Sequence, residues 1–180
     1  MGVLDQPAVV AFDDAVDRAF DRLRGRRRAD RLMYSLTELG DFSLIWHIAS
    51  VADGLLGGPE GTRRMVRLSG ALAVESALVN GVVKSLFRRE RPVHTADRPH
   101  RLRTPRTTSF PSGHASAAAC AVVLLSDGRP VAVRAAVTGL GVLVATSRIH
   151  VRIHHASDVV GGAIVGAALG FMARRAVPLR

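Results

Sequence analysis

Residues 156–173 read ASDVVGGAIVGAALGFMA, and this stretch decides the expected fold. It is apolar after Asp158, and Gly162, Gly166 and Gly170 recur at four-residue spacing. On a helix this spacing gathers the small residues into one stripe, where a second helix can approach closely, as membrane helices commonly do. The stretch therefore predicts a tightly packed, membrane-spanning helix.

Four more apolar segments precede it, at about 42–56, 68–86, 114–125 and 131–147. Glycine and proline turn signals, such as Gly57-Gly58-Pro59, separate them. Several are shorter than the roughly 18–20 apolar residues of an ordinary span, so a soluble helical bundle stays open as the alternative. The favoured prediction is an all-α bundle of about five apolar, membrane-spanning helices.

The first part of the chain, residues 1–41, is amphipathic and differs from the rest. Apolar residues recur there at helical spacing among Asp and Arg, namely Val10, Phe12, Val16, Phe20 and Leu23. A basic cluster at 24–28 follows. We expect a helix that lies either on an anionic membrane surface or against its own protein. Residues 42–180 form the predicted catalytic part of a single domain.

The chain of 180 residues carries a net charge of +10, and Lys84 is its only lysine. Such a charge suits nucleic acid, an anionic membrane or a phosphorylated substrate. With only 4% aromatic residues there is little on which bases could stack, so we expect no nucleic-acid partner. Cys120 stands alone in an apolar run, which indicates a buried hydrophobe and no disulfide. The acidic N-terminus does not resemble a signal peptide.

Three polar clusters border the apolar segments. The first runs from Lys84 to Arg91-Pro92. If the helix extends this far, Lys84 and Arg91 share one face and Pro92 ends it. The two cations then serve either as phosphate ligands or as interfacial anchors.

The second cluster is Pro111-Ser112-Gly113-His114, which opens an apolar run. Free backbone N–H groups at a helix N-terminus bind anions, Ser112 adds a hydroxyl, and Gly113 permits close approach. A simple serine cap beside a surface histidine is the alternative.

The third cluster contains Ser147-Arg148, His154 and Asp158. On a helix, His154 and Asp158 would face each other at i and i+4. A carboxylate bonded to one imidazole nitrogen leaves the other free to attack, while Arg148 offers a bidentate phosphate donor. A metal site built from His150, His154, His155 and Asp158 is the competing interpretation. The surrounding cations disfavour it, so we expect no metal and no cofactor.

Together the three clusters resemble the signature of the type 2 phosphatidic acid phosphatase (PAP2) superfamily, with every position filled in order between Lys84 and Asp158. The resemblance implies that His154 is the nucleophile and forms a phosphohistidine, that Asp158 orients it, and that His114 is the general acid and base. It implies a phosphate cradle of Lys84, Arg91, Ser112, Gly113 and Arg148.

Membrane members of this superfamily commonly have six spans, and here the amphipathic region stands in place of the first. The small size resembles compact bacterial members that act on polyprenyl-phosphate lipids. We therefore expect a multi-pass enzyme of the plasma membrane that dephosphorylates phosphatidate, a polyprenyl diphosphate or a prenyl-phosphoryl sugar phosphate. The side of the membrane that carries the site, and the oligomeric state, stay open. Two alternatives are a soluble acid phosphatase or vanadium haloperoxidase of the same superfamily, and a lipid-binding protein without activity.

Overall fold

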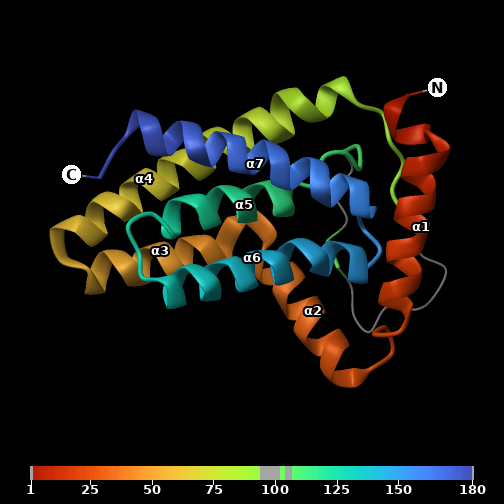
Figure 1. Cartoon of the computed structure of the whole chain (residues 1–180), viewed down its shortest axis with the longest axis horizontal. Helices are drawn as coiled ribbons and strands as arrows, with labels where there is room; N and C mark the ends of the chain where they lie inside the picture. The colour runs from red at the N-terminus through yellow and green to blue at the C-terminus, as the bar shows by residue number, and fades with distance from the viewer. Residues whose placement is uncertain (1, 94–101, 104–106, 180) are drawn as a thin grey trace.

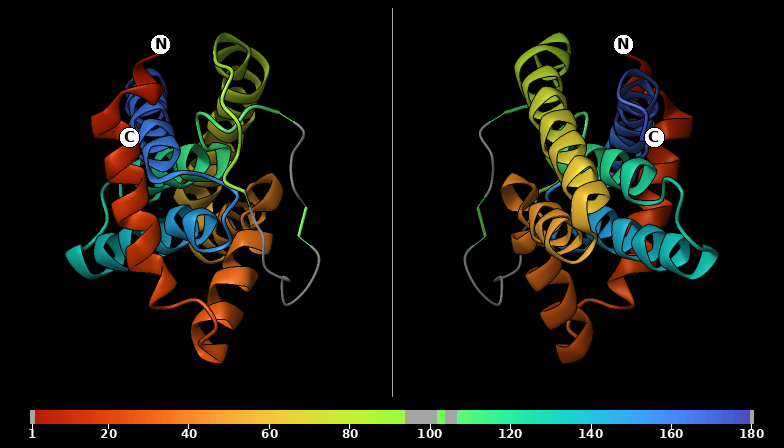
Figure 2. Two further views of the ribbon diagram at one scale, coloured as in Figure 1. Left: turned by 90° about the vertical axis from the view of Figure 1, so that its right-hand side faces the viewer. Right: turned by 90° about the vertical axis from the view of Figure 1, so that its left-hand side faces the viewer.

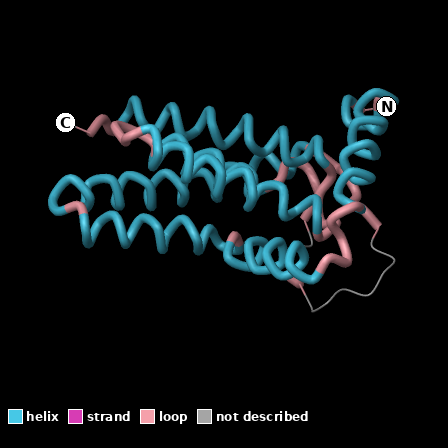
Figure 3. Tube along the Cα trace, turned by 60° about the horizontal axis from the view of Figure 1, so that its bottom comes forward, coloured by secondary structure: helices cyan, strands magenta, loops and turns pink. Residues whose placement is uncertain are grey.

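A computed structural model of the chain describes residues 2–93, 102–103 and 107–179. Within these residues every regular element is a helix, so the all-α prediction is confirmed (Figure 3). The helices are α1 (Pro7–Asp21), α2 (Arg27–Leu39), α3 (Leu44–Leu56), α4 (Gly58–Ser76), α5 (Gly113–Leu125), α6 (Val131–His150) and α7 (Ala156–Ala176). A π-helical turn (Ala77–Val82) and a 3-10 turn (Val83–Leu86) prolong α4.

The apolar helix α5 lies at the centre of the bundle, in contact with α3, α4, α6 and α7 (Figures 1 and 2). It is apolar on all sides, which is typical of a helix that is surrounded by others. The amphipathic helix α1 crosses one end of the bundle (Figure 1). The last turns of α4 and α6 meet the first turns of α5 and α7 at this end, which brings the three polar clusters together.

Five apolar helices form near the expected positions, and three of them are long and apolar enough to cross a membrane. These three are Gly58–Leu86, Val131–His150 and Ala156–Ala176. Helices α3 and α5 have the same length, about 20 Å, which is less than the roughly 30 Å hydrocarbon core of a bilayer. Of the about five predicted spans, three correspond to helices in the described residues that are long enough to cross a bilayer.

Helix α4 begins at Gly58, well before the expected start near residue 68. The added turns carry the arginines Arg63, Arg64 and Arg67, which interrupt the apolar run. In the structure Arg64 is paired with Asp53, and Arg67 with Asp127, so both guanidinium groups are neutralised inside the bundle. Charged residues are tolerated in such helices when they face a partner.

The glycine stripe of α7 packs against α5, as predicted. A Cβ atom at Gly166 would overlap the Ser116 carbonyl oxygen, and one at Gly162 would overlap the Ser112 carbonyl oxygen. Only glycine permits the two backbones to come this close. Cys120 lies on this contact side of α5 and is fully buried.

We expect Gly166→Ala to lower the free energy of unfolding by about 1–3 kcal/mol, because the added methyl group must push two helix backbones apart. Gly139→Ala in α6 is the matched control, since a Cβ atom there meets nothing within 4 Å. Alanine should be neutral or mildly stabilising at that position. Thermal unfolding in detergent compares the two, and equal melting temperatures would contradict the packing argument.

The N-terminal region forms two helices, because the chain turns at Gly25, whose φ is +80°. Val16 and Phe20 of α1 pack against a core cluster that includes Ile149 and Ala156, so this face is covered by the protein itself. Val10 and Phe12 stay exposed. In the basic cluster, Arg24 donates to the carbonyl groups of Ile149 and His150 at the C-terminus of α6. Such capping suits the negative end of a helix dipole.

Candidate active site

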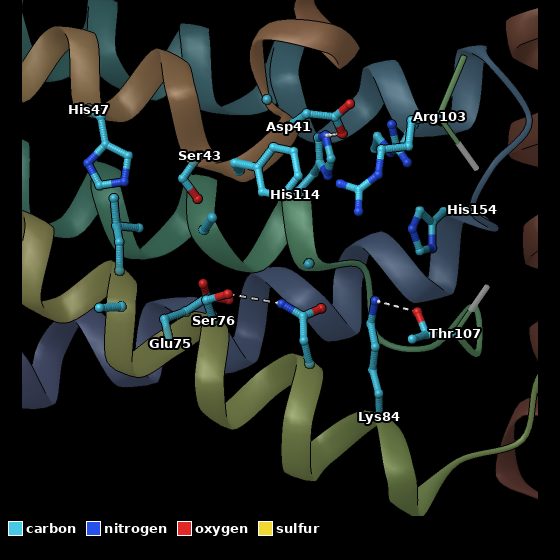
Figure 4. Close-up of a pocket in the computed structure, with 18 of the residues that line it drawn as sticks. Asp41, Ser43, His47, Glu75, Ser76, Lys84, Arg103, Thr107, His114 and His154 are labelled. Carbon is cyan, nitrogen blue, oxygen red and sulfur yellow. Dashed lines mark hydrogen bonds and ion pairs between the residues drawn. The ribbon is translucent and has the colours of Figure 1, made fainter. Parts of the chain in front are cut away.

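A cavity of about 470 Å³ opens where the polar clusters meet (Figure 4). Five of the eight predicted site residues line it, namely Lys84, Gly113, His114, Arg148 and His154. The other three, Arg91, Ser112 and Asp158, lie behind this lining and contact it. The structure thus brings all eight positions to one place.

His154 and Asp158 are in contact, with 3.5 Å between His154 Nδ1 and Asp158 Oδ2. The helical explanation for this contact is wrong. His154 lies in the turn before α7, which begins at Ala156, and the His154 backbone N–H donates to the Arg148 carbonyl. Asp158 is in the first turn of α7 and reaches back to the imidazole. The Nε2 atom of His154 points the other way and lies 3.1 Å from Arg91 Nη1.

Burial lowers the pKa of His154 to about 3, and the guanidinium groups of Arg148 and Arg91 act in the same direction. The side chain is almost fully buried, so water cannot stabilise an imidazolium ion there. His154 is therefore neutral at physiological pH and keeps the lone pair that a nucleophile needs.

This pKa links stability to pH. An unfolded histidine titrates near pH 6.5, so between that pH and about 3 the unfolded chain binds a proton that the folded chain does not. The free energy of unfolding should therefore fall as pH decreases, by about 2 kcal/mol between about pH 7.5 and pH 5. As the pH is lowered, we expect the apparent melting temperature of the wild type to fall more steeply than that of His154→Gln. Parallel curves would show that another group controls the acid transition.

Three residues that the sequence analysis missed hold Asp158 in place. Ser109 Oγ donates to Asp158 Oδ2 at 2.5 Å, and Arg89 Nη1 donates to Asp158 Oδ1 at 2.6 Å. The second guanidinium nitrogen of Arg89 is 2.6 Å from Asp13 Oδ2 in α1. A signal for Asp13 existed, because this acidic residue lies on the apolar face of α1 with Val16 and Phe20. Nothing in the sequence distinguishes Arg89 from its neighbouring arginines.

The prediction that Lys84 and Arg91 share a helix face is wrong. The helix ends at Leu86, and Phe87 is extended. The chain then runs beside residues 107–110, where Ser109 N–H donates to the Arg89 carbonyl. This departure from the helix lets Arg91 turn toward His154 and bind the Ile153 and Thr107 carbonyls. Residues 94–101 and 104–106 of the predicted 87–110 loop lie outside the described residues.

His114 has a carboxylate partner of its own, Asp41. Its Nε2 atom is 3.3 Å from Asp41 Oδ1 and 3.0 Å from the Thr37 carbonyl oxygen. Although burial opposes ionisation, the hydrogen bond to His114 and nearby positive charge hold the pKa of Asp41 below its ordinary value. Burial and the nearby Arg148 lower the pKa of His114, and the ionised Asp41 acts in the opposite direction, so that Asp41 supports a proton on His114. A Cβ atom at Gly40 would lie 2.5 Å from the His114 ring, so glycine is needed there.

The remaining predicted phosphate ligands occupy different positions around the cavity. Ser112 caps α5, with its hydroxyl accepting from Ala115 N–H, and its own N–H donates to the Asp158 carbonyl. Gly113 lines the cavity at the start of α5, facing Lys84 and Asn80. Arg148 is 1% exposed and donates to Thr37 Oγ1 at 2.6 Å.

The competing metal cluster does not assemble. His150 lies 2.8 Å from Asp30 and stacks edge-on against Phe20, so it faces away from His154. His155 precedes α7 and lines a second cavity, beside Asp13 and Asp17. Among the described residues no three His, Cys, Asp or Glu side chains converge as metal ligands would.

A neutral histidine backed by a carboxylate, a second histidine with its own carboxylate and several cations around one cavity suit phosphoryl transfer, because its transition state spreads negative charge over oxygen atoms. The PAP2 superfamily profile matches residues 64–180, and the chain belongs to this superfamily. Because three of its helices are also long and apolar enough to cross a membrane, its class is a membrane lipid phosphatase.

Particular relatives carry more specific names. The chain is 36% identical over 129 residues to the decaprenylphosphoryl-5-phosphoribose phosphatase of Mycolicibacterium smegmatis, covering 71% of this chain and 68% of the relative. It is 34% identical over 140 residues to the phosphatase of that name from Mycobacterium tuberculosis, covering 75% and 73%.

Two solved structures share the fold. The crystal structure of Aquifex aeolicus LpxE superposes with a TM-score of 0.76 at 21% identity, covering 97% of this chain and 99% of that one. The transmembrane PAP2-type phosphatidylglycerolphosphate phosphatase from Bacillus subtilis gives 0.69 at 26% identity, covering 96% and 87%. The superposition on LpxE extends across the N-terminal region, which the superfamily profile does not reach.

Proposed function

We propose that this phosphatase removes the terminal phosphate of a prenyl-phosphoryl sugar phosphate, through a phosphohistidine on His154. The observation that carries the mechanism is the buried pair of His154 and Asp158, with His154 Nε2 directed toward Arg91 beside the cavity. The named activity of the two mycobacterial relatives supports the choice of a prenyl-linked pentose phosphate among the lipid substrates.

In the first step the substrate phosphate takes the place of His154 as the partner of Arg91. Lys84, Arg148 and the amide of Gly113 bind its remaining oxygens, and Ser112 supports this amide by capping α5. His154 Nε2 forms a bond to phosphorus while the bond to the sugar oxygen breaks. Asp158 stabilises the positive charge that develops on the imidazole ring.

His114 supplies the proton for the leaving sugar oxygen. With Nε2 donating to Thr37 and Asp41, a proton on Nδ1 can be transferred and later recovered from the attacking water. That water breaks the phosphorus–nitrogen bond and releases inorganic phosphate, which restores neutral His154. None of the proposed reaction steps uses a metal ion.

The same proposal includes a multi-pass arrangement in the plasma membrane, with α4, α6 and α7 as full spans. Residues 1–41 then lie at the catalytic end, where the exposed Arg27, Arg28 and Arg31 suit an anionic surface. Residues 42–180 form the catalytic domain.

Release of phosphate by the purified full-length protein in detergent tests the proposal. We expect turnover of a prenyl-phosphoryl pentose phosphate at a higher kcat/KM than of phosphatidate, with no loss in a metal chelator. Loss of activity in the chelator would overturn the mechanism, and a preference for phosphatidate would overturn the substrate.

A further inference from the structure

The cavity extends beyond the predicted phosphate ligands. Figure 4 shows Glu75 and Ser76 of α4 at the end opposite His154, with His47 and Ser43 across the cavity from them. The phosphoryl-transfer steps use none of these four residues. The volume of about 470 Å³ lies within the roughly 300–1,000 Å³ of sites that enclose drug-sized ligands. The cavity can therefore hold the group next to the phosphate as well.

Glu75 is the unusual residue at this end. It is only 2% exposed and lies on a helix that is long and apolar enough to cross a membrane. The Ser116 hydroxyl and the Lys84 ammonium group act on its carboxylate, but Oε1 accepts no hydrogen bond from any residue that the structure describes. A buried carboxylate oxygen without a donor is costly, so such an atom calls for a partner from outside the protein.

The chemistry of that partner follows from the cavity. The unpaired oxygen Oε1 is a hydrogen-bond acceptor, so the ligand must offer a donor, either a hydroxyl or an ammonium group. Lys84, Arg103 and Arg148 also line the cavity and repel a cation. A neutral hydroxyl group therefore fits better than an amine.

Neighbouring side chains can hold further hydroxyl groups. Asn80 Nδ2 donates to Ser76 Oγ at 3.3 Å, which leaves the Ser76 proton free to donate to a ligand. The ring of His47 lines the same end of the cavity and can donate or accept. A carboxylate beside such groups is a recurring way to bind sugar hydroxyls.

We propose that Glu75, with Ser76 and His47, forms a subsite for a neutral, hydroxyl-bearing head group, a sugar or another polyol, next to the scissile phosphate. Glu75 lies roughly 13 Å along the helix from Lys84, toward the interior of the bundle. In the proposed binding mode the lipid tail extends in this direction from the phosphate at His154, which places the subsite between phosphate and tail. The placement beside the phosphate rests on the proposed function.

The kinetic test compares two substrates of the full-length protein in detergent, a prenyl-phosphoryl pentose phosphate and a prenyl diphosphate, which has no hydroxyl groups. We expect Glu75→Gln to lower kcat/KM for the pentose substrate about ten- to a hundredfold, mainly through KM, and to change the diphosphate by less than about twofold. Ser76→Ala should show a smaller effect with the same selectivity. Glu60→Gln, an exposed position on the same helix, is the matched control and should change neither substrate. An equal loss on both substrates would overturn the subsite.

A binding test does not depend on turnover. In a His154→Ala background, pentose 5-phosphate should raise the melting temperature more than inorganic phosphate does, and Glu75→Gln should abolish only this difference. If the wild type releases no phosphate from any lipid yet the difference persists, the proposed function fails and the subsite stands. If pentose 5-phosphate stabilises no more than inorganic phosphate, the subsite is overturned.

Discussion

Replacing His154 with alanine is expected to lower phosphate release by about a thousandfold or more, a barrier increase of at least about 4 kcal/mol. The variant has no atom that can form the bond to phosphorus, while the cations around the cavity stay in place. Asp158→Asn should cost less, because the imidazole keeps its lone pair and loses only the charge that stabilises it.

Rapid acid-free quenching of the wild type with labelled substrate should trap phosphate on the protein as an acid-labile adduct, and His154→Ala should trap none. His155→Ala is the matched control, since this neighbouring histidine faces the second cavity and has no part in the proposed steps. Activity of His154→Ala within tenfold of the wild type would remove His154 from the mechanism.

The second large effect is on stability. Arg89→Met should lower the free energy of unfolding by about 3–5 kcal/mol, because it leaves Asp13 and Asp158 buried without their shared cation. For a chain of this length the corresponding fall in melting temperature is roughly 6–20 °C. Phosphate release should fall as well, since Asp158 loses the donor on Oδ1.

Arg88→Met provides the control, because Arg88 is exposed and adjacent. Adding Asp13→Asn to Arg89→Met should recover part of the lost stability, as it removes one of the two uncompensated charges. A melting temperature of Arg89→Met equal to that of Arg88→Met would show that the Asp13–Arg89–Asp158 chain does not stabilise the fold. Because α1 contributes Asp13, the ion pairs of Asp13, Arg89 and Asp158 also couple the N-terminal region to the nucleophile.

The helical class followed from the sequence because helix formation has a local cause. Apolar runs between glycine and proline turns predicted five helices, and the glycine stripe of α7 predicted a close helix contact that the structure places against α5. Predictions that relied on helical register near a helix end did worse. Both Lys84 with Arg91 and His154 with Asp158 were assigned to helix faces. In the structure a helix ends within the first pair and another begins within the second.

The supporting network could not be read from the sequence. Asp13 and Arg89 are distant from Asp158 in the chain, and each has equivalent neighbours in the sequence. Only the packing of α1 across the ends of α6 and α7 selects these two residues as its partners. The pairing of His114 with Asp41 has the same origin, because α5 and the turn before α3 meet only in the folded bundle.

The sequence by itself determined the all-α class, and it supplied the set of residues proposed for phosphoryl transfer, since periodicity and motif spacing are properties of short segments. The tertiary structure alone decided which of these residues face the cavity and which stand behind them. It also decided that Glu75 is buried at the far end, where no described residue donates to Oε1. The physical reason is that burial and long-range ion pairs depend on which helices pack together, and in this bundle α5 lies between the segments that supply the site.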